Sequence, residues 1–198
     1  MRALRMIPLL VCLLILCAGP AAATSTASED TFKLEEGFQG YPWGVTPDEL
    51  EGFQKIGTKN NADFYVCICV TYLIEDISVP QVVYGFVDNK LYGVFIDIED
   101  QSVFDKLLAY ITKTYGEPRV KEEASEIVHR WNVGDVKIKL KDDLAKGDRK
   151  LSFYYSPLSR QVELSPFRKT DPEDEPRPMS WTPPTGKQKP VSIPLLSF

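Results

Sequence analysis

The strongest constraint on the fold is a strict alternation of apolar and lysine side chains between residues 136 and 141. Successive side chains of a strand point to opposite faces of a sheet. The alternation therefore predicts a strand with one face in a core and the other face outward. A Gly134-Asp135 turn and an apolar run at 127–133 come before it and complete a hairpin. The predicted inward residues are Val136, Ile138 and Leu140, and the outward ones are Lys137, Lys139 and Lys141.

Further runs rich in β-forming residues occur at 64–74, 82–87, 91–98 and 151–155. The Asp88-Asn89 pair between the second and third of these runs is typical of a hairpin turn. Strands that follow one another through hairpins pair antiparallel, so we expect an antiparallel sheet.

Two helices are predicted. The first covers 46–57, with Thr46 as the N-cap, Pro47 at the first helical position and Glu49 completing a capping box. The second begins at Ser102, has apolar residues at a spacing of three and four, and ends before Gly116.

Together these elements predict a single α+β domain at 38–156, in the order α-β-β-β-α-β-β-β. Both helices are expected to pack on one face of the antiparallel sheet. A domain of roughly 120 residues suffices for one hydrophobic core and not for two.

The N-terminus has the layout of a secretory signal peptide over 1–23. Arg2 and Arg5 precede an apolar run at 6–18, and small residues follow at 21–23. An uncleaved anchor is the alternative, and whether the segment is cleaved stays open. Cleavage would remove two arginines and no acid, taking the net charge from −5 to −7. An acidic chain does not favour nucleic acid as a partner. Residues 24–37 are polar, and we expect a flexible segment there.

The C-terminal segment 157–198 holds nine of the fifteen prolines and an acidic run at 171–175. This composition predicts a largely disordered tail. The tail nevertheless ends in an apolar cluster that a spacer would not need. Two interpretations stay open: the cluster fills the groove of a partner, or it folds back on this domain. Its apolar members are Ile193, Leu195, Leu196 and Phe198.

The residues with reactive side chains are few. Cys67 and Cys69 lie two apart on a predicted strand, roughly 6–7 Å between Cβ atoms, whereas a disulfide needs about 3.5–4.5 Å. We interpret both as core residues, with a redox-active pair as the alternative. His129 lies among apolar residues and is interpreted as structural. No motif for a nucleophile, a metal or a phosphate is present, so we expect no catalytic residue, no metal ligand and no cofactor.

Two surface features are candidates for binding. Lys137, Lys139 and Lys141 concentrate positive charge on one hairpin of an acidic chain. They form either a solvated face or a docking surface for an acidic partner, which could also be the run at 171–175. Trp43 is interpreted as a core plug at the entry of the first helix, and a small-ligand site near it is the alternative.

The pattern Phe38-x-Gly40-x-Pro42-Trp43-Gly44 resembles the start of a family of small secreted bacterial envelope proteins that have no assigned biochemistry. The helix–hairpin plan is more distantly similar to the small outer-membrane assembly lipoproteins and to the β-lactamase-inhibitor-like fold. The resemblance implies a Gram-negative source and a periplasmic location.

The function expected from these observations is non-enzymatic. We expect a periplasmic or secreted protein that binds another envelope protein, with no membrane span in the mature chain. The alternatives are a small hydrolase or thiol-redox protein that uses Cys67, Cys69 or His129, and a small-ligand binder near Trp43.

Overall fold

The computed structural model describes residues 33–68, 70–74, 77–79, 81–162 and 191–195. The predicted signal peptide and most of the segment at 24–37 lie outside the described residues. So do Cys69, Leu196, Phe198 and the acidic run at 171–175.

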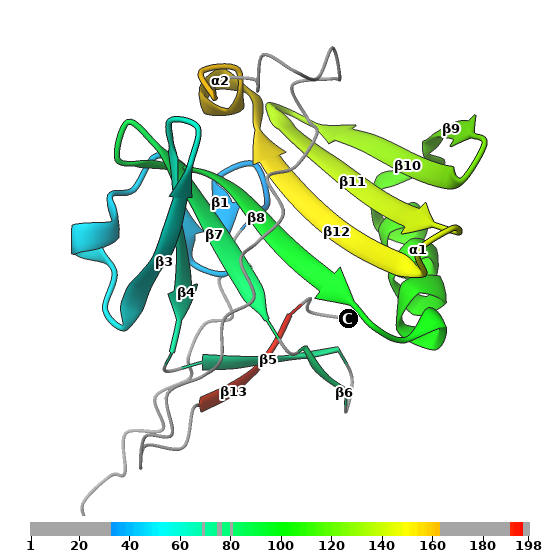
Figure 1. The fold of residues 1–198 in the computed structure, drawn as a ribbon, viewed down its shortest axis with the longest axis horizontal. Helices are drawn as coiled ribbons and strands as arrows, with labels where there is room; N and C mark the ends of the chain where they lie inside the picture. The colour runs from blue at the N-terminus through cyan, green and yellow to red at the C-terminus, as the bar shows by residue number, and fades with distance from the viewer. Residues whose placement is uncertain (1–32, 69, 75–76, 80, 163–190, 196–198) are drawn as a thin grey trace, which may run out of the picture. The chain divides into compact units, whose positions relative to one another are not determined.

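The main element is an antiparallel sheet of eight strands in the spatial order β3-β4-β7-β8-β12-β11-β10-β9 (Figure 1). This confirms the antiparallel sheet predicted from the hairpins. The strands are β3 (Phe53–Lys59), β4 (Ala62–Cys67), β7 (Val82–Val87), β8 (Lys90–Ile98), β9 (Arg119–Glu123), β10 (Glu126–Val133), β11 (Val136–Asp143) and β12 (Asp148–Tyr155).

Both predicted hairpin turns are present. Asp88 and Asn89 have φ angles of 48° and 61° between β7 and β8. Left-handed backbone at both turn positions matches the twist of the flanking strands. Gly134 (φ 57°) turns the chain between β10 and β11.

Smaller elements complete the described fold. The strands β1 (Gly37–Phe38) and β2 (Tyr41–Pro42) pair with each other. A second, three-stranded sheet has the order β13-β5-β6, from β13 (Val191–Pro194), β5 (Val70–Ile74) and β6 (Ile77–Val79). Its pairing of β13 with β5 is parallel.

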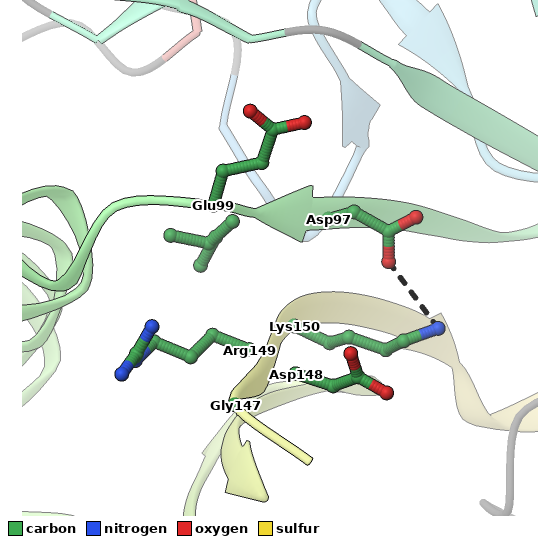
Figure 2. A pocket seen from close by; sticks show the side chains of 7 residues that line it. Asp97, Glu99, Gly147, Asp148, Arg149 and Lys150 are labelled. Atoms are coloured by element: carbon green, nitrogen blue, oxygen red, sulfur yellow. Dashed lines mark ion pairs between the residues drawn. The ribbon is translucent and has the colours of Figure 1, made fainter.

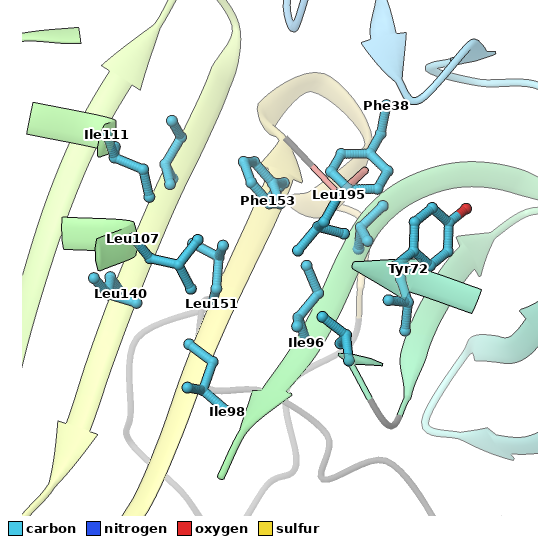
Figure 3. Packing of buried hydrophobic residues seen from close by; sticks show 14 of the residues in the cluster. Phe38, Tyr72, Ile96, Ile98, Leu107, Ile111, Leu140, Leu151, Phe153 and Leu195 are labelled. Atoms are coloured by element: carbon cyan, nitrogen blue, oxygen red, sulfur yellow. The ribbon is translucent and has the colours of Figure 1, made fainter. Parts of the chain in front are cut away.

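The large sheet has an inner and an outer face. We define the inner face as the one that carries Val136, Ile138 and Leu140, each at most 1% exposed. The long helix α1 (Gln101–Tyr115) packs its Leu107 and Ile111 into the same hydrophobic core (Figure 3). The predicted inward set and the second predicted helix are thus confirmed.

The boundaries of α1 follow from its caps. The Asp100 side chain accepts a hydrogen bond of 2.6 Å from the Ser102 amide, so Asp100 is the N-cap. At the other end Gly116 adopts φ 86°, a conformation that glycine tolerates better than other residues.

The prediction of a first helix over 46–57 is wrong. The Thr46 amide and hydroxyl both donate to Glu49 Oε1, at 3.3 and 2.7 Å, but they stabilise only the 3-10 turn η1 (Pro47–Glu49). Gly52 then takes a φ of 77°, and Phe53 starts β3. Pairing with β4 and ring contacts of Phe53 with Tyr84 outweigh the local helix signal.

The prediction that both helices share one face is also wrong. The short helix α2 (Ser156–Ser159) was not predicted, and its Leu158 packs against the outer-face cluster. The expected order α-β-β-β-α-β-β-β therefore holds only as a broad α+β class, with a β-dominated fold.

The run at 64–74 was predicted as one strand but divides into two. β4 ends at Cys67 in the large sheet, and β5 starts at Val70 in the small one. Apolar content alone does not show such a division, because both halves of the run form strands.

Candidate functional site

The two halves of the outer face differ in chemistry. The half formed by β4, β7 and β8 is apolar and buried, and we call it the apolar half. Ile56, Leu158 and Val162 pack against it. Its buried members, together with Tyr154 of β12, are Ala62, Phe64, Val66, Val83, Val87, Tyr92 and Phe95.

Gly85 makes close ring packing possible in the apolar half. An added Cβ at this position would lie 2.8 Å from Tyr92 Cε1 and 2.9 Å from Phe95 Cε2. The ladder between β7 and β8 shifts between Gly85 and Phe86. This bulge places the Tyr92 ring on the outer face beside Phe95, at a centroid distance of 6.1 Å.

The other half of the outer face, on β9, β10, β11 and β12, is the cationic half. The register of these strands places seven basic residues on it. They are Arg119, Lys121, Arg130, Lys137, Lys139, Lys141 and Lys150.

Charge in the cationic half is sorted into rows that cross the strands. The end row is acidic and consists of Glu123, Glu126, Asp143 and Asp148. The row beside it contains Lys121, Lys141 and Lys150, and the next contains Arg119, Arg130 and Lys139. In that last row, three cations lie directly opposite one another on adjacent strands.

Ion pairs join the acidic row and its neighbour. Lys121 Nζ lies 2.5 Å from Glu123 Oε1, and Lys141 Nζ lies 2.5 Å from Glu126 Oε1. At the border with the apolar half, Lys150 Nζ lies 3.2 Å from Asp97 Oδ1 on β8. The acids that these pairs use are all at one end of the strands, so positive charge dominates toward the row of Arg119.

The predicted partner-binding lysines lie together in this half. The expectation that all three are accessible on the outer face is wrong for Lys139. Lys137 and Lys141 are partly exposed, whereas Lys139 is only 5% exposed. Lys139 lies on β11 between Arg130 of β10 and Ser152 of β12. Its ammonium group adds positive charge to the face but is too buried for direct contact with a partner.

Part of the tail, which was predicted to be largely disordered over 157–198, has regular structure. Residues 191–194 form β13, and the Leu195 amide donates to the Leu73 carbonyl at 2.7 Å. Leu195 is fully buried among Phe38, Ile96 and Phe153 (Figure 3). The Gln39 side chain donates to its carbonyl. Two interpretations of the apolar cluster were left open. For Leu195 the structure favours the one in which the tail folds back, because its side chain is part of this domain's core.

The other apolar tail residues predicted to contact a partner are less buried than Leu195 or lie outside the described residues. Ile193 is partly buried against the same core, and Val191 is 65% exposed. Leu196 and Phe198 lie outside the described residues, so their predicted contact with a partner stays a prediction. Residues 157–162, expected in the tail, continue the folded unit through α2.

Cys67 and His129 lie far apart in the sheet. Cys67 ends β4 and belongs to the inner core. His129 lies on β10, which is five strand positions away, on the order of 24 Å at the usual spacing of strands. The described residues therefore bring no Cys–His pair together.

His129 has an aromatic environment at the edge of the core. Its ring lies 6.2 Å from that of Phe104 and 6.3 Å from that of Trp131. Burial lowers the pKa of His129 and outweighs the opposing effects of the Leu140 backbone and of Asp142 and Glu122. The neutral imidazole is thus favoured, as expected for a structural histidine.

Trp43 is a packing residue in this fold. Its ring stacks on Tyr155 with an interplanar angle of 6°, and its Nε1 donates to the Leu34 carbonyl at 2.8 Å. The N–H group that a ligand would use is thus already bonded.

Two hollows adjoin the end of β8 and share Asp97, Ile98 and Glu99. One has a volume of about 480 Å³ and extends along residues 147–150, and the other has about 310 Å³ and extends to β6. Figure 2 shows the Asp97–Lys150 ion pair across the first hollow. Arg149 Nε lies 3.4 Å from Asp142 Oδ1. Both basic side chains of this hollow are thus engaged by acids.

Within the described residues, no group of three or more histidine, cysteine or acidic side chains is arranged to hold a metal ion. The same residues include no helix long and apolar enough to cross a membrane.

No protein-family model matches the chain, and no curated protein sequence matches it. Among solved structures, it is similar to a crystal structure of an extracellular protein containing a SCP domain from Bacillus anthracis str. Ames, with a TM-score of 0.34 and 10% sequence identity. The match covers 63% of this chain and 50% of that one, so this chain spans about half the length of that protein. A similarity of this size supports no inference about function.

Sequence reasoning missed part of the cationic half. Arg119 and Lys121 were not singled out because β9 was not predicted, and Arg130 was not singled out although its strand was. The alternation Arg-Val-Lys directly after Pro118 was the available signal.

Proposed function

We propose that this chain is a non-enzymatic, secreted or periplasmic protein that binds another protein of the bacterial envelope through the cationic half of its outer face. The proposal of export depends on the N-terminal sequence, in which Arg2 and Arg5 precede an apolar run and small residues.

The observation that supports a binding role is the row of Arg119, Arg130 and Lys139. These three cations are ladder partners on adjacent strands, and Arg119 is exposed. A carboxylate of a partner can reach the exposed Arg119, and arginine pairs well with carboxylates. The partner best suited to this face is therefore an acidic protein surface.

The contrast with the apolar half supports the same choice. There the outer face is covered from within the chain, by Ile56, Leu158 and Val162. A partner that binds the cationic half would meet exposed side chains such as Arg119 and Lys121.

Photo-crosslinking in the native envelope tests the proposal. A photoreactive amino acid is placed at Arg119 or Lys137, and at the exposed Asp48 of η1 as a matched control. We expect a discrete crosslinked protein from positions 119 and 137 that disappears at high salt, and none from position 48. Equal adducts from all three positions, or none from any, would contradict the proposal.

A further inference from the structure

The strand β9 forms an open edge of the large sheet on its cationic side. No described strand pairs with its second edge. Its five ladder pairs with β10 run from Arg119↔Arg130 to Glu123↔Glu126 without a shift. Every residue of β9 is exposed. A regular, exposed edge strand is a template on which a further strand can pair.

The opposite edge, β3, is less suited to the same role. Its register against β4 shifts between Lys55 and Gly57. A bulge bends the strand and interrupts the regular series of backbone groups, and bulges protect edges against unwanted pairing. The two edges of one sheet thus differ, and only the β9 edge is regular.

The side chains of β9 indicate what an added strand would carry. Arg119, Lys121 and Glu123 lie on the outer face, and Lys121 pairs with Glu123, whereas no acid of β9 within the described residues forms an ion pair with the exposed Arg119. Val120 points to the opposite side, at the register position of His129, and is 51% exposed. A strand paired with β9 would place alternate side chains beside these two different surfaces. An acidic residue suits the first surface at Arg119, and an apolar residue suits the second at Val120, whereas Glu122 and Glu123 lie toward the other end of β9.

We infer that the partner joins the sheet as an additional strand on β9, through an extended segment in which acidic and apolar side chains alternate. This inference rests on the proposed function and specifies how the partner binds. A net charge of −5 disfavours a long, uniformly anionic polymer at a distance, so a short acidic segment of a protein fits better.

Peptide binding to the full-length protein tests the inference. The probe is a fluorescein-labelled peptide of seven residues that alternates glutamate with valine. Its matched control has the same side chains but N-methylated backbone amides on one edge, which cannot pair with a strand. We expect fluorescence anisotropy to show binding of the first peptide and at least tenfold weaker binding of the second.

Variants of the protein locate the site. We expect Arg119→Glu combined with Lys121→Glu to weaken peptide binding at least tenfold. Lys90→Glu reverses an exposed charge at the start of β8 and is expected to leave binding unchanged. The melting temperature of each variant verifies that the protein is folded.

The outcomes separate the two proposals. Equal binding of both peptides, lost on charge reversal at Arg119 and Lys121, would overturn strand addition while the cationic half remained the binding surface. No binding of either peptide at millimolar concentration would also overturn strand addition. The proposed function itself fails only if position-specific crosslinks are absent from positions 119 and 137.

Discussion

The apolar and cationic halves of the outer face are continuous in one sheet, yet they differ in chemistry and, at β9, in exposure. On β7 and β8, outward side chains such as Val83 and Phe95 are at most 3% exposed, and α2 contributes to their cover. On β9, every residue is exposed. The comparison shows that the chain covers the apolar outer residues of β7 and β8, whereas the largely charged β9 is exposed.

The largest effect expected from this comparison comes from Phe95→Ala. The Phe95 ring lies 5.5 Å from that of Tyr154 and 6.0 Å from that of Phe64. Its removal leaves a cavity in a packed cluster, so we expect a loss of about 4 kcal/mol in the free energy of unfolding. Urea denaturation measures this value. A loss below about 1 kcal/mol would show that the apolar half is not a true core.

Leu195→Ala tests how much the folded-back tail stabilises the core on the inner face. Leu195 is 0% exposed, so we expect a loss of about 3 kcal/mol. The control Val191→Ala alters a side chain that is 65% exposed and is expected to cost less than about 0.5 kcal/mol. Equal, small effects in thermal unfolding would instead favour the interpretation in which the tail docks into a partner.

Gly85→Ala tests why the rings of the apolar half pack so closely. The new Cβ would clash with Tyr92 and Phe95, and we expect a cost of about 2 kcal/mol. In a Tyr92→Leu background the first clash is absent, so the same substitution should cost less. A double-mutant cycle measures the difference. Additive effects would argue against the clash.

The cationic half should respond weakly to loss of an ion pair. Lys141 and Glu126 are 22% and 31% exposed in their side chains. We expect Lys141→Ala to cost at most about 1 kcal/mol, less in 1 M salt, because water and ions screen the pair. A cost as large as that of Phe95→Ala would remove the distinction between the two halves.

The smallest expected effect is a dependence of stability on pH through His129. Its pKa in the folded state is below the reference value of 6.5, so the unfolded chain binds a proton more readily. The stabilising contribution is therefore complete above pH 6.5 and decreases as the pH falls through the folded-state pKa. His129→Phe should remove this part of the profile in urea titrations. An unchanged profile would assign the dependence to carboxylates.

Asp143 of the acidic end row has a lowered pKa. Burial favours the neutral acid, but the Lys146 side chain and amide, which donate at 3.1 and 3.2 Å, outweigh it and lower the pKa of Asp143. Asp143 therefore keeps its negative charge to a lower pH than an unperturbed aspartate.

Several features could be predicted because their cause lies within a few residues. The turn at Asp88-Asn89 depends on two residues that accept positive φ. The alternation from Val136 to Lys141 assigns each side chain to a face. The helix α1 was predicted to begin at Ser102, one residue after its observed start, and its N-cap Asp100 was not predicted. The predicted grouping of Lys137, Lys139 and Lys141 follows from the same alternation.

Other features depended on contacts between distant parts of the chain. Phe53 joins β3 instead of a helix because β4 pairs with it, and Leu195 is buried because β5 and Phe38 form its site. The row of Arg119, Arg130 and Lys139 exists only because three strands align in one register. The sequence by itself thus determined turns, caps and strand faces, which short-range geometry controls. The tertiary structure alone decided which segments pair and which side chains are covered, because the free energy of those choices comes from surfaces that meet only in the folded chain.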